Sequence, residues 1–208
     1  MCGISGVFDF GTARKDRIKS DLQSFNRNLG HRGPDSSGIW IDSTNTVGLA
    51  HTRLSILDLS NNGYQPMLNQ SSKDVICYNG EIFNYSYLNK QYLSNNTFNS
   101  NSDTETILKL YQKYRLNIFD KMDGMFAFAI WDHNRQELLL ARDKSGKKPL
   151  YFTERNGQFI FASELKVLLT YPRFKKEIDN KKIYDFFAYH YVPSVSYTHL
   201  TLPTKRIV

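Results

Sequence analysis

The order of strand-like and helical segments limits the fold of this chain more than any other feature. Apolar residues at helical spacing predict helices at residues 14–29, 102–114, 163–169 and 183–191. Strand-like segments are more numerous and form hairpin-like pairs. They lie at residues 2–10, 38–41, 47–52, 74–78, 126–132, 137–142, 150–153 and 158–162. This order favours an α+β fold of stacked, mainly antiparallel sheets with helical outer layers.

Local signals set the expected ends of several elements. Ser102-Asp103-Thr104-Glu105 matches a capping box at the start of a helix. Ser163 is expected to cap the next helix. Asn79-Gly80, directly after the strand at 74–78, favours a sharp turn. The Asn-rich stretch at 89–101 is expected to be a surface loop or a weak helix.

Charge and composition argue against several functional classes. The formal net charge is +7, but Lys and Arg are dispersed, which favours a solvated basic surface over a nucleic-acid site. No run of about 20 apolar residues predicts a membrane span, and no secretory signal is recognisable. The two cysteines, Cys2 and Cys77, fit a reducing cytoplasm. Neither they nor the five histidines have the spacing of a metal site, so no metal is expected.

Cys2 follows the initiator methionine and opens an apolar, strand-like stretch. Removal of Met1 is expected, because the side chain after it is small. Cys2 would then carry a thiol and a free α-amino group on one residue. The thiolate is the nucleophilic form, and an amine with a pKa of roughly 7.7–8.0 can take the thiol proton. Nucleophile and base would thus come from one residue. An inert thiol at the chain end is the plain alternative.

Further residues have the chemistry of an amino-acid pocket. Asn79 and Gly80 offer a side-chain amide and a backbone N–H to an oxyanion, although both also suit a simple hairpin turn. Arg53 can bind a carboxylate with two parallel hydrogen bonds, although a surface ion pair would also explain it. Glu81 and Asp103 are carboxylates that can hold an ammonium group, although an acid at a helix start is favoured in any case. Together they predict a pocket for a free amino acid with a side-chain amide.

A series of motifs in the chain resembles a known family. The chain is similar to the N-terminal glutaminase domain of glutamine-hydrolysing asparagine synthetases, which are class II glutamine amidotransferases. MCGI alone is typical of class II amidotransferases, whereas HRGPD with RLSI and MFAFAIWD indicates the asparagine synthetase branch. The matching stretches are MCGISGVFDF, HRGPDSSG, HTRLSILDLS, NGYQPM, YNGEIFNY, SDTETIL, MDGMFAFAIWD, ARDKSGKKPLYF and FASELKVLL.

The resemblance implies a fold, a reaction and roles for individual residues. It implies the four-layer αββα sandwich of N-terminal nucleophile hydrolases, and hydrolysis of glutamine to glutamate and ammonia through a γ-glutamyl thioester on Cys2. Asn79 and Gly80 resemble the family's oxyanion hole. The remaining expected contacts bind the substrate, with Arg53 at the α-carboxylate and two acids at the α-amino group. These substrate-binding residues are Arg53, Leu54, Ser55, Ile56, Leu57, Glu81 and Asp103.

The resemblance also implies partners that this sequence does not contain. The family passes ammonia to a C-terminal synthetase domain that uses ATP and Mg²⁺ to activate aspartate. No such domain is recognisable here, so no cofactor is expected in this chain. Residues 2–193 are expected to form the amidotransferase domain, and residues 194–208 a tail unlike the family. A homodimer is possible by analogy. Two alternatives stay open: a glutamine-binding module without turnover, or an ammonia donor to another acceptor.

Overall fold

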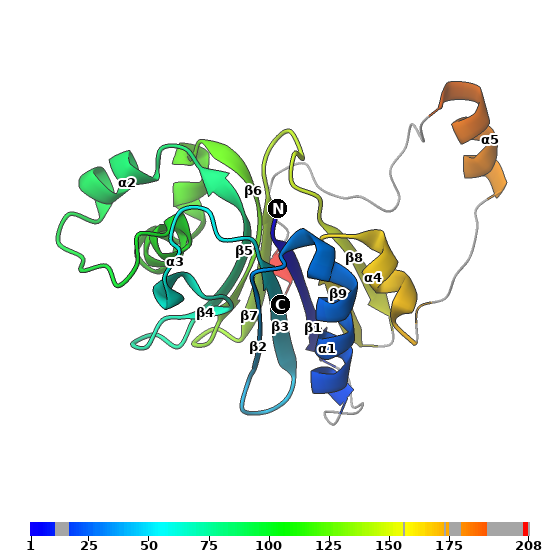
Figure 1. Ribbon diagram of the computed structural model, residues 1–208, viewed down its shortest axis with the longest axis horizontal. Helices are drawn as coiled ribbons and strands as arrows, with labels where there is room; N and C mark the ends of the chain where they lie inside the picture. The colour runs from blue at the N-terminus through cyan, green and yellow to red at the C-terminus, as the bar shows by residue number, and fades with distance from the viewer. Residues whose placement is uncertain (11–16, 156, 173, 175–179, 191–205, 208) are drawn as a thin grey trace.

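The computed structural model describes residues 1–10, 17–155, 157–172, 174, 180–190 and 206–207. It contains two five-stranded antiparallel sheets, sheet A and sheet B. The sheets face one another, and helices lie on both outer sides (Figure 1).

Sheet A contains the start of the chain in its centre. Its strands are β1 (Gly3–Asp9), β2 (Ser36–Ile41), β3 (Val47–Arg53), β8 (Tyr151–Arg155) and β9 (Gln158–Ala162). Their spatial order is β2–β3–β1–β9–β8. In the β1–β3 register Gly3 lies opposite Thr52, so Cys2 lies beside the end of β3.

Sheet B contains the second set of predicted site residues. Its strands are β4 (Met67–Leu68), β5 (Val75–Ile82), β6 (Gly124–Asp132), β7 (Glu137–Arg142) and β10 (Arg206–Ile207). Their spatial order is β10–β7–β6–β5–β4. β5, with Asn79 and Gly80 in its second half, therefore lies between the long strand β6 and the short strand β4.

Helices cover the outer face of each sheet. They are α1 (Ile18–Leu29), α2 (Tyr85–Tyr92), α3 (Asp103–Tyr114) and α4 (Leu165–Thr170). A further helix, α5 (Asn180–Tyr189), stands apart from both sheets (Figure 1). Short 3₁₀ turns lie at Gly30–Arg32 (η2), Asn61–Gly63 (η3) and Arg115–Lys121 (η4). α1 and α4 pack on sheet A, and α2 and α3 lie on the side of sheet B (Figure 1). No helix of the described residues is long and apolar enough to cross a membrane.

The core has three apolar layers, one between the sheets and one under each helical side. Side chains alternate across a strand, so each strand serves two layers. In β1, Ile4 packs between the sheets and Val7 packs under α1. In β5, Cys77 packs between the sheets and Tyr78 packs toward α3. This layering confirms the predicted four-layer αββα sandwich.

The predicted turn at Asn79-Gly80 is wrong. β5 continues through these residues to Ile82 and stays paired with β6. Pairing along β6 over the whole strand outweighs the local turn preference of an Asn-Gly pair. Gly80 is suited to the site for another reason: a Cβ there would lie 2.4 Å from the Met125 carbonyl oxygen. A close approach of two strands, and not a turn, therefore excludes a side chain at Gly80.

Other expected boundaries shift by a few residues. α4 begins at Leu165 with Glu164 as its N-cap, so Ser163 does not cap it. Ser102 does cap α3, but the Glu105 carboxylate accepts hydrogen bonds from Asn99 and Ser100 and not from Ser102, so the reciprocal half of the predicted capping box is wrong.

The Asn-rich segment at 89–101 begins inside a helix, since α2 spans Tyr85–Tyr92, and continues as a loop. The helix predicted at 14–29 begins in a part of the chain that the structure does not describe, because residues 14–16 lie outside the described residues. The domain boundary expected at 193 also lies outside them, as do residues 194–205 and 208 of the predicted tail.

Candidate active site

Cys2 faces the space between the two sheets at the point where β1 begins. Ile4 packs between the sheets, and a residue two positions earlier on an extended chain points to the same side. The Leu54 N–H donates a hydrogen bond to Cys2 Sγ at 3.4 Å, and the thiol donates to the Leu54 carbonyl oxygen at 3.6 Å. The thiol is thereby held against the loop that follows β3.

Two residues from distant parts of the chain, Ser163 and Arg32, hold the backbone of this N-terminal segment in place. The Ser163 N–H donates to the Ile4 carbonyl oxygen at 2.8 Å, and the Ile4 N–H donates to Ser163 Oγ at 2.9 Å. Arg32 Nε donates to the carbonyl oxygen of Cys2 at 2.9 Å. Ser163, expected to cap a helix, thus extends the β1–β9 pairing toward the nucleophile.

Arg32 is itself anchored by Glu164. Arg32 Nη1 donates to Glu164 Oε1 at 3.0 Å, and His31 and Lys166 contact the same carboxylate at 2.8 and 3.1 Å. Burial alone would raise the pKa of Glu164, but the hydrogen bonds from Arg32, His31 and Lys166 outweigh it and lower the pKa to about 2. Neither Arg32 nor Glu164 was predicted from the sequence to support the site.

Glu164→Gln is expected to lower the free energy of unfolding at neutral pH by about 1–2 kcal/mol, because a charged acceptor is lost at a partly exposed site. A carboxyl whose folded pKa is depressed stabilises the fold above its unfolded pKa near 4.5, and this contribution is lost as the pH falls toward 2. Denaturant titrations at pH 7, 4 and 3 should therefore show the gap between wild type and variant narrowing with acid. A difference in the free energy of unfolding that stays the same at all three pH values would contradict the depressed pKa of Glu164.

A cavity of about 290 Å³ opens beside Cys2. It lies where the end of β3, the second half of β5 and the start of α3 meet. Residues from all three elements and from the loop after β3 line it. They are Met1, Cys2, Arg53, Leu54, Ile56, Leu57, Asp58, Gly63, Gln65, Tyr78, Asn79, Gly80, Glu81, Ser102, Asp103, Thr104, Met125 and Lys148.

Strand β5 directs an N–H group into this cavity. β4 pairs only with the first two residues of β5. Beyond it the Tyr78 N–H donates to Gln65 Oε1 at 2.6 Å, and the Ile82 N–H donates to Asp103 Oδ2 at 2.9 Å. Backbone N–H groups of a strand alternate in direction, so the Gly80 N–H points to the same side as these two. Gly80 lines the cavity, and its N–H is therefore available to a ligand there.

The Asn79 side chain supplies a second donor. Asn79 is 1% exposed, and its Nδ2 has no hydrogen-bond partner among the described residues. An unpaired buried amide costs free energy, so such a group in a native fold calls for an explanation. Asn79 follows Cys77 by two positions and so faces the space between the sheets, as Cys2 does. Its unused donor is suited to an oxygen that a ligand brings.

Arg53 is a buried residue that also lines the cavity. Its Nη1 donates to the Ser60 carbonyl oxygen at 3.1 Å, and its Nη2 donates to the Asp58 carbonyl oxygen. These two bonds fix the orientation of the group. A guanidinium has about five N–H donors, so enough remain for a carboxylate.

Asp103 lies at the start of α3, and Glu81 lies near the end of β5. Asp103 Oδ2 accepts hydrogen bonds from the Tyr78 hydroxyl at 2.6 Å and from the Ile82 N–H at 2.9 Å. Burial raises the pKa of the Asp103 carboxyl, and the neighbouring Glu81 acts in the same direction against those hydrogen bonds. A bound ammonium group would offset both effects.

The thiol of Cys2 needs a base in this environment. Burial raises its pKa above the usual value, although the Leu54 N–H, the N-terminal ammonium, Arg53 and Arg32 act against the shift. In this chain the α-nitrogen of Cys2 is an amide, because Met1 precedes it. The Met1 side chain lines the cavity, with its sulfur 3.5 Å from Lys148 Nζ. Removal of Met1 would expose an amine beside the thiol.

Nine of the ten predicted site residues line one cavity, and Ser55 is the exception. The Ser55 N–H donates to Asp35 Oδ2 at 2.7 Å, which ties the loop after β3 to the loop before β2. Gln65, Tyr78 and Lys148 also line the cavity, and none of them was predicted from the sequence. Each belongs to a stretch that was quoted for the resemblance, but nothing in its local pattern indicated a position at the site.

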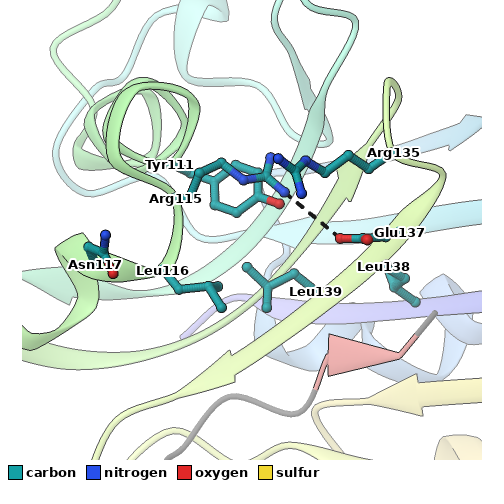
Figure 2. A pocket seen from close by; sticks show the side chains of 8 residues that line it. All are labelled: Tyr111, Arg115, Leu116, Asn117, Arg135, Glu137, Leu138 and Leu139. Atoms are coloured by element: carbon teal, nitrogen blue, oxygen red, sulfur yellow. Dashed lines mark ion pairs between the residues drawn. The ribbon is translucent and has the colours of Figure 1, made fainter.

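A second cavity of similar volume lies on the far side of sheet B, between η4 and β7 (Figure 2). Its walls carry Arg115 and Arg135, but Arg115 pairs with Asp132 and lies 3.8 Å from Glu137. The guanidinium also stacks over Tyr111, 4.3 Å from the ring centre. The Arg115 charge is therefore already balanced within the protein. None of the residues that line this cavity is a cysteine, serine or threonine.

The sequence and the fold of this chain are similar to those of known proteins. A model of the glutamine amidotransferase domain matches residues 1–202. The chain belongs to this family. It is 43% identical to asparagine synthetase B [glutamine-hydrolyzing] of Escherichia coli K12, over 85% of this chain and 31% of that protein. It is 39% identical to putative asparagine synthetase [glutamine-hydrolyzing] 2 of Methanocaldococcus jannaschii, over 93% of this chain and 40% of that protein.

A solved structure of similar fold is the glutamine phosphoribosylpyrophosphate amidotransferase from Bacillus subtilis, complexed with ADP and GMP. It superposes with a TM-score of 0.65 at 21% identity, over 80% of this chain and 43% of that one. At that identity it supports the fold alone. The family predicted from the motifs is confirmed. This chain spans less than half the length of these relatives.

Proposed function

We propose that this domain hydrolyses glutamine to glutamate and ammonia, with Cys2 as the nucleophile. The observation that carries the proposal is the buried Nδ2 of Asn79, which has no hydrogen-bond partner among the described residues and lies next to Gly80 in the lining of the cavity that Cys2 also lines. Two neighbouring donors beside a thiol are suited to the oxyanion that forms when a carboxamide is attacked. Family membership supports the same reaction.

The first half of the reaction forms an acyl-enzyme. After loss of Met1, the free α-amine takes the proton of the Cys2 thiol. The sulfur attacks the carboxamide carbon, and Asn79 and Gly80 donate to the oxyanion of the tetrahedral intermediate. The α-ammonium returns the proton to the leaving nitrogen. The C–N bond then breaks, releasing ammonia and leaving a γ-glutamyl thioester on Cys2.

The second half consumes one water. The α-amine removes a proton from the water, whose oxygen attacks the thioester carbon. The same two donors stabilise the second oxyanion. Collapse of the intermediate breaks the C–S bond and releases glutamate, and the α-ammonium returns its proton to the sulfur, which restores the thiol and the free amine. The nucleophile, the oxyanion donors and the base in these steps all belong to the chain, and one amine serves as base and acid in turn.

Arg53 and the two acids are proposed to select a free α-amino acid. Arg53→Ala is expected to raise KM for glutamine by about 10²-fold, because a charge-assisted pair of hydrogen bonds to the α-carboxylate is lost. The turnover number at saturating glutamine should change much less, since the interaction is made equally in the ground and transition states. Steady-state kinetics of ammonia release would measure both. A fall in kcat with unchanged KM would contradict the role.

The larger protein is proposed to use this ammonia to make asparagine. The relatives named above are glutamine-hydrolysing asparagine synthetases, of which this chain matches 31% and 40%. A C-terminal synthetase domain that uses ATP and Mg²⁺ would then receive ammonia from this domain. A reducing cytoplasm is proposed as the compartment, because a free, reactive thiol persists there.

The proposal is tested by measuring ammonia and glutamate release from glutamine by the purified chain. Equal amounts of both products, with no release from asparagine, are expected. Binding of glutamine without product release would favour the glutamine-binding module instead. Asparagine is the matched control substrate, since it carries the same α-groups and differs by one methylene. Equal rates for both amides would overturn the assignment of the pocket.

A further inference from the structure

His51 is a fully buried histidine that the proposed mechanism does not use. It lies on β3, two residues before Arg53, and faces β5 across the space between the sheets. Its Nε2 is 3.0 Å from the carbonyl oxygen of Tyr78. A carbonyl only accepts hydrogen bonds, so Nε2 carries the proton and donates. Nδ1 is then a bare acceptor, and it has no partner among the described residues.

The peptide unit that His51 contacts is the one that leads into Asn79. Tyr78 lies beyond the reach of β4, so its N–H and C=O groups lack a strand partner on that side. Two side chains replace the strand. Gln65 Oε1 accepts from the Tyr78 N–H at 2.6 Å, and His51 Nε2 donates to the Tyr78 oxygen at 3.0 Å. The strand segment before the two oxyanion donors is therefore held at a gap in the sheet.

We infer that His51 is a positioning residue, which fixes the Tyr78–Asn79 peptide and thereby the placement of the Asn79 and Gly80 donors. This inference rests on the proposed function. His51 does not touch the substrate in this account and acts only through β5. His51 would affect the reaction through geometry, because the donors must lie within about 2.7–3.1 Å of the oxyanion.

The environment of His51 keeps the imidazole ring neutral, the form in which Nε2 is its one donor. Burial lowers the pKa of His51 to about 4, and the nearby Arg53 cation acts in the same direction against the Tyr78 hydrogen bond. The ring is therefore neutral at physiological pH. A neutral ring has one donor, and the Tyr78 carbonyl uses it.

Two variants of equal polarity test whether His51 positions the Tyr78–Asn79 peptide or only fills space in the core. The side-chain amide of His51→Gln reaches the place of Nε2 and can donate to the Tyr78 oxygen. The shorter amide of His51→Asn reaches only the place of Nδ1. Four quantities are measured for each variant: kcat, KM for glutamine, the inhibition constant of glutamate γ-semialdehyde, and the rate of Cys2 alkylation by iodoacetamide. The aldehyde forms an oxyanion on Cys2, whereas alkylation needs no oxyanion hole.

His51→Asn is expected to lower kcat by roughly 10- to 100-fold, the scale of a donor misplaced by about 1 Å. KM and the alkylation rate should stay within about twofold of wild type, and inhibition by the aldehyde should weaken in proportion to kcat. His51→Gln should recover kcat to within about threefold, since its N–H is restored.

The inference is overturned if the two variants have the same kcat, or if alkylation falls together with kcat. A wild-type chain that releases no ammonia would instead overturn the proposed function. The two failures are thus distinguishable.

Discussion

Replacing Cys2 with alanine is expected to lower the glutaminase rate by at least roughly 10⁴-fold, because the sulfur that forms the acyl-enzyme is lost. Cys2 lies at the start of β1, and its side chain is only partly buried. The free energy of unfolding should therefore change by less than about 1 kcal/mol. Ammonia release and denaturant titration of the same preparation would measure both effects.

Cys77→Ala is the matched control, because it removes the other thiol of the chain. Cys77 is fully buried between the sheets, and its thiol contacts the Ala50 carbonyl oxygen at 3.7 Å. This variant should lose some stability but keep its turnover per folded molecule. Wild-type turnover in Cys2→Ala, or loss of turnover only in Cys77→Ala, would refute the assignment of the nucleophile.

Blocking the amino group of Cys2 is expected to lower kcat by about 10²- to 10⁴-fold, the usual contribution of a general base. The reason lies in the environment of the thiol. Burial raises the pKa of Cys2, so the thiol is protonated at neutral pH and depends on a nearby base. While any residue precedes Cys2, its nitrogen is an amide and cannot accept the proton.

The test uses one preparation before and after a proteolytic cut. A short N-terminal extension keeps the nitrogen acylated, and a protease that cleaves directly before Cys2 then exposes the amine. The activity should rise on cleavage, and the mass of the chain should confirm the new terminus. The Cys2→Ala chain with the same extension controls for effects of cleavage alone. Full activity of the uncleaved chain would contradict the role of the amine.

The layers of the fold could be predicted because they depend on local periodicity. Alternation in segments such as Phe126–Asp132 indicates a strand with two buried faces, and helical spacing from Ile18 to Leu29 indicates an outer helix. The turn predicted at Asn79-Gly80 is wrong because the conformation of these residues does not depend on local sequence alone. Its outcome depends on pairing with β6, which lies more than forty residues away in the sequence.

The functional groups of the candidate site could likewise be predicted from the sequence, whereas the residues that hold them in place could not. Residue types indicated a thiol, an oxyanion hole, a guanidinium and two acids, and the fold places these groups in one cavity. The groups that hold them did not stand out. Arg32, Ser163 and His51 contact the site through backbone atoms of Cys2, Ile4 and Tyr78, respectively. Such contacts follow from strand register, which no single stretch of sequence specifies.

Trapping the acyl-enzyme tests the central claim most directly. The chain with Cys2 at its N-terminus is mixed with glutamine, quenched in acid within its turnover time, digested and examined by mass spectrometry. The account predicts one γ-glutamyl group on the N-terminal peptide, attached through Cys2 and lost on treatment with hydroxylamine. Ammonia release without any adduct on Cys2, or an adduct on Cys77, would contradict it.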